Sequence, residues 1–96
     1  MALVKTVDGS CVTLAIDGWL DTQTAPELGV ELDGLGDDVE SLVLDLSALE
    51  YVSSAGIRQI VAAHKKMSGN LEVRGVAPEV LEVFRLTGVD KRLNIV

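Results

Sequence analysis

The chain has 96 residues, of which 48% are hydrophobic and only 3% aromatic, and its formal net charge is −7. This length predicts one domain over residues 1–96, with a core of aliphatic side chains. The acidic charge disfavours direct contact with nucleic acid or with an anionic membrane surface. The single cysteine excludes an internal disulfide, and one Cys with one His makes no zinc site.

The start of the chain and the lengths of the apolar runs predict the cellular location. Met1–Lys5 is not followed by an apolar leader segment, and no apolar run reaches the length that spans a bilayer. We therefore expect a cytoplasmic protein without membrane insertion. Cys11 lies in a strand-like apolar run, which favours a buried structural thiol.

The first elements are predicted to be a hairpin. Val7-Asp8-Gly9-Ser10 is typical of a tight turn, because Asp-Gly readily adopts positive φ angles. The turn joins strands near residues 3–7 and 11–16, which should be antiparallel.

A helix is predicted next, over about residues 24–35. The chain leaves the sheet at Gly18-Trp19-Leu20-Asp21. Thr24 is the expected N-cap, Pro26 lies in the first turn, and Glu27 completes a capping box. The buried stripe should consist of Leu28, Leu32 and Leu35.

The second half alternates strands and helices. We predict strands at 42–46, 71–75 and 93–96, and helices at 54–67 and 78–87. The resulting order is ββαβαβαβ. It predicts an α/β fold in which a mixed, largely parallel sheet of about five strands, with one antiparallel edge pair, packs against three helices as a compact layer.

Ser53-Ser54-Ala55-Gly56 forms the corner between a strand and the second long helix. Ser54 is placed at the helix N-terminus, where backbone N–H groups and the helix dipole favour an added negative charge. No general base, metal cluster or glycine-rich nucleotide loop accompanies it, and His64 lies roughly 15 Å further along the helix. The corner therefore favours a phosphate acceptor over a catalyst, although Ser54 could serve only as an N-cap.

Four segments in this order carry a family resemblance. They are Gly18-Trp-Leu-Asp21 with Thr24-Ala25, Asp45-Leu-Ser-Ala-Leu-Glu-Tyr-Val52, Ser53-Ser-Ala-Gly-Ile-Arg58 and Leu86-Thr-Gly-Val-Asp90. Together they cover nearly the whole chain, and the chain resembles the STAS domain of bacterial anti-sigma factor antagonists. The resemblance implies a STAS-type fold for residues 1–96.

The resemblance also implies a function without enzymatic activity or cofactor. Ser54 matches the family's serine that a kinase phosphorylates, and this kinase is also the anti-sigma factor. The unphosphorylated antagonist binds that partner, the phosphorylated form is released, and a phosphatase resets it. The expected docking face consists of Trp19, Asp21, Ser53, Ser54, Ala55, Gly56, Ile57 and Arg58.

One departure from the family concerns the corner. Ser53 stands where many members carry Asp, so Ser53 is a second, weaker candidate for phosphorylation. The oligomeric state is left open between a monomer and a weak dimer.

Several side chains have two interpretations. Asp21 either satisfies backbone donors in the turn or lies near the switch serine and helps the kinase recognise it. Trp19 either anchors a partner or covers the end of the core. Arg58 can pair with a phosphate, pair with a partner carboxylate or remain solvated. Asp45 is expected to bind loop amides, and His64 is expected at the rim of the core.

Two other functions compete with the antagonist. A STAS accessory subunit of a lipid or anion transport system would dock on its partner without phosphorylation. A small hydrolase or nucleotide-binding enzyme is disfavoured, because the base, the metal ligands and the phosphate-binding loop are missing.

Overall fold

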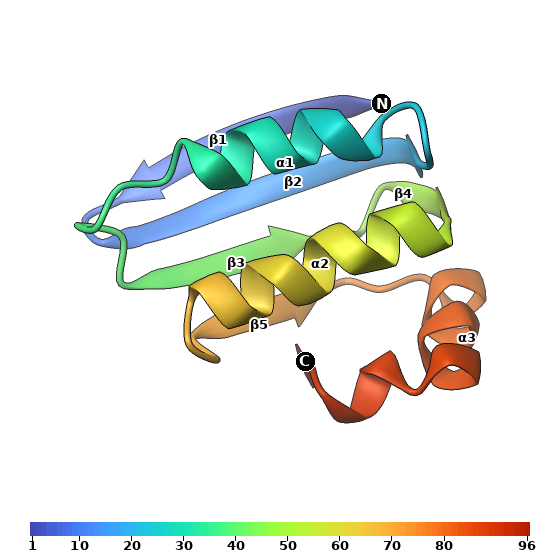
Figure 1. Ribbon diagram of the computed structural model, residues 1–96. Helices are drawn as coiled ribbons and strands as arrows, with labels where there is room; N and C mark the ends of the chain where they lie inside the picture. The colour runs from blue at the N-terminus through green and yellow to red at the C-terminus, as the bar shows by residue number, and fades with distance from the viewer.

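The computed structural model describes residues 1–96 as a six-stranded sheet with three α-helices (Figure 1). The strands are β1 (Ala2–Asp8), β2 (Cys11–Leu20), β3 (Ser41–Asp45), β4 (Leu49–Val52), β5 (Leu71–Arg74) and β6 (Asn94–Ile95). The helices are α1 (Ala25–Asp33), α2 (Ser54–Lys66) and α3 (Pro78–Thr87), followed by the 3-10 turn η1 (Val89–Lys91). The predicted α/β class and element order are confirmed, and β4 and η1 are added to them.

The sheet has the order β1-β2-β3-β5-β6, with β4 paired to β2 outside this path. Only β1 and β2 are antiparallel, as predicted, and every other pair is parallel. The ten-residue strand β2 has two partners on one side. Its first half, Cys11–Ala15, pairs with β3, and Gly18–Leu20 pairs with β4 after an irregularity at Gly18/Trp19.

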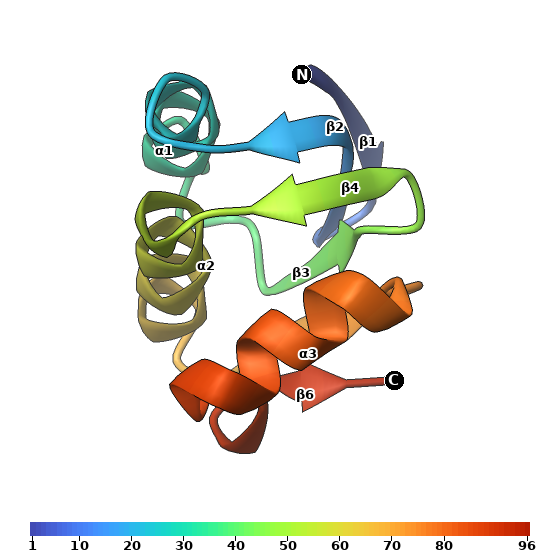
Figure 2. The ribbon, with the colours of Figure 1, turned by 90° about the vertical axis from the view of Figure 1, so that its right-hand side faces the viewer.

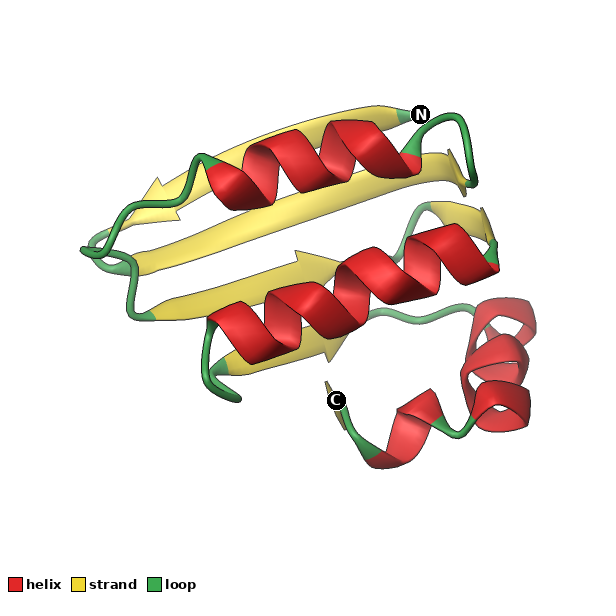
Figure 3. Ribbon diagram, in the orientation of Figure 1, coloured by secondary structure: helices red, strands yellow, loops and turns green.

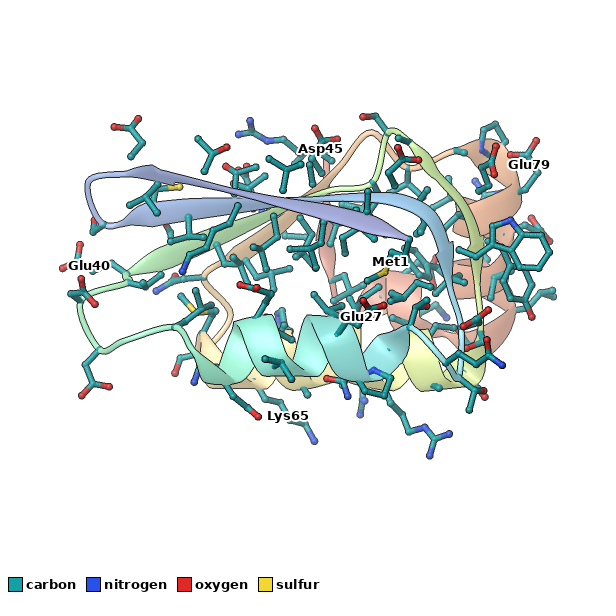
Figure 4. All side chains as sticks on the ribbon, turned by 90° about the horizontal axis from the view of Figure 1, so that it is seen from above. Met1, Glu27, Glu40, Asp45, Lys65 and Glu79 are labelled. Atoms are coloured by element: carbon teal, nitrogen blue, oxygen red, sulfur yellow. The ribbon has the colours of Figure 1, made fainter.

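Helices α1 and α2 cover one face of the sheet, and the other face carries no helix (Figures 2 and 3). In β2 the buried residues Val12, Leu14 and Ile16 alternate with half-buried ones, as a strand with one covered face requires. Viewed from above, Lys65 lies on the helix side and Asp45 on the open side (Figure 4). Helix α3 lies beside β4 at the end of the sheet (Figure 2).

The core is aliphatic, as the composition predicted, with one aromatic exception. It contains 23 buried residues from strands and helices alike, and Phe84 of α3 is its only aromatic side chain. The largest fully buried side chains of β2, β3 and β5 are Leu14, Ile16, Leu20, Leu42, Leu44 and Leu71. None of the helices is long and apolar enough to cross a membrane.

The first turn follows the predicted hairpin with a small shift. Asp8 pairs with Cys11, so the loop residues are Gly9 and Ser10. Gly9 has φ +61°, a left-handed conformation that favours glycine. The positive φ therefore falls on Gly9 alone, and Asp8 remains in the strand.

Candidate functional site

The predicted corner lies where β2 and β4 end side by side and α2 begins (Figure 2). Leu20 and Val52 are the last paired residues of the two strands. The next amide, that of Ser53, donates a hydrogen bond of 2.9 Å to the carbonyl of Leu20. This bond fixes the start of α2 against the end of β2.

The two adjacent serines have different environments. Ser53 has extended backbone angles, φ −97° and ψ 174°, and its Oγ accepts a hydrogen bond of 3.3 Å from the amide of Gly56. Ser53 is therefore the N-cap, and the interpretation of Ser54 as the cap is wrong. Ser54 is the first residue of α2, its side chain is exposed, and its hydroxyl makes no hydrogen bond in the structure.

Gly56 and Ile57 were expected on the docking face, but both are buried beneath it. A Cβ at Gly56 would lie 2.8 Å from the Cγ and the carbonyl oxygen of Leu20, so only glycine lets α2 approach β2 this closely. Ile57 is 7% exposed because its position on the helix turns it toward the core. These two residues position the corner, and half-buried Ala55 lies at its surface.

Asp21 has the first of its two predicted roles, as the centre of the turn before α1. Its Oδ1 accepts hydrogen bonds from the amides of Gln23 at 2.9 Å and Thr24 at 3.1 Å. The hydrogen bond from the amide of Thr24, together with the others, lowers the pKa of the Asp21 carboxyl. Asp21 also follows Leu20 directly, so its turn adjoins the corner.

The predicted capping box of α1 is not formed. The Thr24 hydroxyl donates a hydrogen bond of 2.8 Å to the carbonyl of Trp19 and accepts one of 2.8 Å from the amide of Asp21. It therefore binds the preceding turn, and Thr24 makes no side-chain bond to its own helix. These bonds link the end of β2 to the start of α1.

Trp19 lies on the surface, in contact with an aromatic residue that was missing from the predicted docking face. Trp19 and Tyr51 are register partners in β2 and β4, and their ring centroids are 5.0 Å apart with an interplanar angle of 41°. They are 56% and 45% exposed. The interpretation of Trp19 as a cover for the core is therefore wrong. Tyr51 could have been found had β4 been predicted, because its pairing with β2 brings the two rings together.

Arg58 lies over the first turn of α2. Its Nε donates a hydrogen bond of 3.5 Å to the carbonyl of Ser54, so the guanidinium remains near that serine. Arg58 also borders a shallow hollow of about 250 Å³ between the first turns of α1 and α2. The other lining residues are Thr22, Ala25, Pro26, Ala55 and Gln59.

The electrostatics of this helix start differ from those of the other helices. The first turns of α1 and α3 contain Glu27 and Glu79, whereas the first turn of α2 contains no acidic residue. A helix N-terminus carries a partial positive charge, which an anion there would stabilise. The start of α2 can therefore accept a negative charge without like-charge repulsion from its own first turn.

Asp45 and His64 lie outside this group. Asp45 Oδ1 accepts from the hydroxyl of Ser47 at 2.7 Å and from its amide at 3.1 Å, which confirms the predicted loop contact. The hydroxyl hydrogen bond, with the amide bond, lowers the pKa of Asp45. His64 is half-buried near the end of α2, as expected for a residue at the core rim.

Comparison with known proteins places the chain in a family. A family model described as "Mlab, STAS domain" matches residues 4–96. A Bordetella bronchiseptica protein named as an anti-sigma factor antagonist, BtrV, is 34% identical over 86 residues, which cover 85% of this chain and 73% of that protein. The crystal structure of an anti-sigma factor antagonist from Mycobacterium paratuberculosis has a TM-score of 0.86 at 26% identity, covering 98% of this chain and 83% of that one.

A second solved structure agrees in fold alone. The phosphorylated form of SpoIIAA, a Bacillus cell fate determinant, has a TM-score of 0.68 at 16% identity over 99% of this chain and 91% of that one. The family model and the Bordetella relative each match most of the sequence, including the corner before α2. This chain belongs to the STAS domain family.

Proposed function

We propose that this protein is an anti-sigma factor antagonist without catalytic activity of its own. The unphosphorylated chain binds an anti-sigma factor that is also a serine kinase. The kinase transfers the γ-phosphoryl group of ATP to Ser54 Oγ, and the phosphorylated chain is released. A phosphatase then hydrolyses the phosphoester. The names of the Bordetella and Mycobacterium relatives support this class of function.

The observation that carries the proposal is the difference between the two serines. The Ser53 hydroxyl is half-buried and caps α2, so its modification would remove the cap. The Ser54 hydroxyl is exposed and unbonded, so a kinase can reach it without disturbing the helix. Ser54 is therefore the proposed acceptor, and Ser53 is the residue that positions it.

A phosphate on Ser54 is compatible with the fold. It would add roughly −1.5 to −2 charges at neutral pH, next to free N–H groups at the start of α2. The guanidinium of Arg58, bonded to the Ser54 carbonyl, can then pair with it. That SpoIIAA has been solved in a phosphorylated form agrees with this tolerance of the fold.

The partner would contact a docking surface that we define as Trp19, Tyr51, Ser54 and Arg58 with the hollow beside Arg58. Exposed aromatic residues and arginine are typical anchors of protein interfaces. A phosphate on Ser54 would have to lose its hydration water when the partner covers this surface. A loss of about a hundredfold in affinity requires only about 2.7 kcal/mol, which one buried charge readily supplies.

The test begins with the natively expressed protein, purified with its bound partner. Mass spectrometry after incubation with ATP should locate one phosphate on Ser54 and none on Ser53. Isothermal titration calorimetry then compares the wild type with Ser54→Asp, Ser54→Ala and Tyr51→Ala. We expect Ser54→Ala to bind but accept no phosphate, Ser54→Asp to lose about a hundredfold in affinity, and Tyr51→Ala to bind more weakly.

Glu50→Gln, an exposed change next to Tyr51 in β4, is the matched control and should bind as the wild type does. An unmodified Ser54 together with a Ser54→Asp variant of undiminished affinity would refute the proposal. Recovery of a transport ATPase subunit, with no kinase activity in the complex, would instead support the accessory-subunit function.

A further inference from the structure

Half of the basic residues lie in two segments, the end of α2 opposite to Ser54 and the segment after α3. The chain has eight Lys and Arg residues, and four of them, Lys65, Lys66, Lys91 and Arg92, lie at the end of α2 or in the segment after α3. All four are exposed, and neither of the two ion pairs in the structure involves them. In residues 61–66 and 89–93 the only acidic residue is Asp90.

A hollow joins the two segments. Its volume is about 220 Å³, and we call it the basic groove, defined by Val61, His64, Lys65, Arg92 and Leu93. Leu93 is buried and Val61 half-buried, so the floor is apolar and the rim carries the charges. Small-molecule sites usually measure about 300–1,000 Å³, so the basic groove suits one inserted side chain better than a metabolite.

The helix dipole explains only part of this cluster. Cations in the last turn of a helix are stabilised by its partial negative charge, which accounts for Lys65 and Lys66. Lys91 is the last residue of η1 and Arg92 follows it, so the dipole of α2 gives no reason for Arg92 to border the same hollow as Lys65. Lys65 and Arg92 meet at this hollow and create a local positive field on a chain whose net charge is −7.

The acidic surface outside the basic groove limits which kind of anion can bind in it. At physiological ionic strength charges are screened beyond about 8 Å, so a short acidic segment in the basic groove interacts mainly with the nearby cations. A nucleic acid or a membrane would extend past the cluster onto acidic surface and be repelled. Charge complementarity therefore favours a short acidic segment of a protein.

We propose that the basic groove binds an acidic segment of a partner protein, with one apolar side chain inserted between Val61 and Leu93. Flanking Asp or Glu side chains of that segment pair with Lys65 and Arg92. Eleven helical positions separate Ser54 from Lys65, which corresponds to about 16 Å. The basic groove can therefore be occupied while the docking surface is bound or phosphorylated, and it provides a second, independent contact.

The probe is the acetylated, amidated hexapeptide Asp-Glu-Leu-Leu-Glu-Asp, added to the full-length ¹⁵N-labelled protein. We expect amide shift changes confined to residues 61–66 and 89–93, and loss of these changes with a peptide in which Asn and Gln replace the acids. Lys65→Glu should weaken binding at least tenfold. Lys5→Glu, which makes the same charge change on the distant edge strand β1, should leave binding unchanged.

Because Lys65 is exposed, Lys65→Glu should fold, and circular dichroism will verify this. Arg92→Gln is the second variant, and it should also weaken peptide binding. The proposal would be overturned if the peptide caused no amide shift changes in the basic groove. It would also be overturned if Lys5→Glu weakened peptide binding as much as Lys65→Glu does. Binding of phosphatidylglycerol vesicles or inorganic phosphate at Lys65 without binding of the peptide would overturn it as well. Phosphorylation of Ser54 in the Lys65→Glu variant reports separately on the proposed function.

Discussion

Gly56→Ala is the substitution that most directly tests the geometry of the corner. A Cβ at this position would lie 2.8 Å from both the Cγ and the carbonyl oxygen of Leu20. Leu20 is fully buried, and its carbonyl is held by the amide of Ser53, so neither atom can move away without breaking the junction. The steric clash therefore competes with the gain in helix propensity that alanine normally brings.

The sizes of these two opposing effects decide whether Gly56→Ala stabilises or destabilises the protein. Overpacking a buried site costs about 1–3 kcal/mol, and the close backbone contact places this site at the upper end. Replacing a helical glycine by alanine gains about 1 kcal/mol. We expect a net loss of about 2 kcal/mol in the free energy of unfolding, which for a domain of this size lowers Tm by roughly 10 °C. Urea unfolding followed by far-ultraviolet circular dichroism measures the loss.

Gly29→Ala is the matched control within α1. A Cβ there meets only the end of the Gln59 side chain, at 3.2 Å, and this flexible side chain can move. Gly29→Ala should therefore be as stable as the wild type, or more stable by up to about 1 kcal/mol. If Gly56→Ala proved as stable as Gly29→Ala, the close packing of α2 on β2 would be refuted.

Three further changes test the serines, the core and the acid dependence. Ser53→Ala removes the N-cap and should lower the free energy of unfolding by about 0.5–1 kcal/mol, whereas Ser54→Ala should stay within about 0.5 kcal/mol of the wild type. Urea unfolding of both variants checks this. A larger loss in Ser54→Ala than in Ser53→Ala would contradict the assignment of the cap. Phe84→Ala removes a side chain with no exposed surface and should cost about 3–5 kcal/mol, seen as a large fall in Tm; a small fall would show that α3 packs loosely. The pKa values of Asp21 and Asp45 are lowered below 3.8 in the folded state, so their contribution to stability is present above that pH and is lost as the pH falls through the lowered values. Unfolding measured between about pH 5 and pH 2 should show this loss, and Asp45→Asn should reduce it; an unchanged profile in Asp45→Asn would argue against the contribution of this carboxylate.

The sequence predicted the elements whose signals are local. The Asp-Gly turn, with φ +61° at Gly9, and the helices predicted at 54–67 and 78–87 each depend on nearby residues. Strand β4 was missed because its four residues follow a short turn and only its two ends are buried. Its strand character depends on pairing with the end of β2, which the local pattern does not reveal.

The site was predicted in outline, but the assignment of the two serines required the tertiary structure. Ser53 and Ser54 are both suitable caps by residue type. The hydrogen bond from the Ser53 amide to Leu20 fixes Ser53 in the extended conformation, and so leaves Ser54 free. The basic groove could not be predicted from the sequence either, because Lys65 and Arg92 come together only through the packing of the C-terminal segment on α2.

The contact between Trp19 and Tyr51 has a consequence for spectroscopy. These residues are the only tryptophan and the only tyrosine of the chain, and both lie outside the aliphatic core. Intrinsic emission and near-ultraviolet signals thus arise mainly at the end of the sheet that carries the proposed docking surface, and they carry little information on the packed interior. A change in fluorescence can therefore follow complex formation without any added label, and an unchanged one is no proof that the domain is folded.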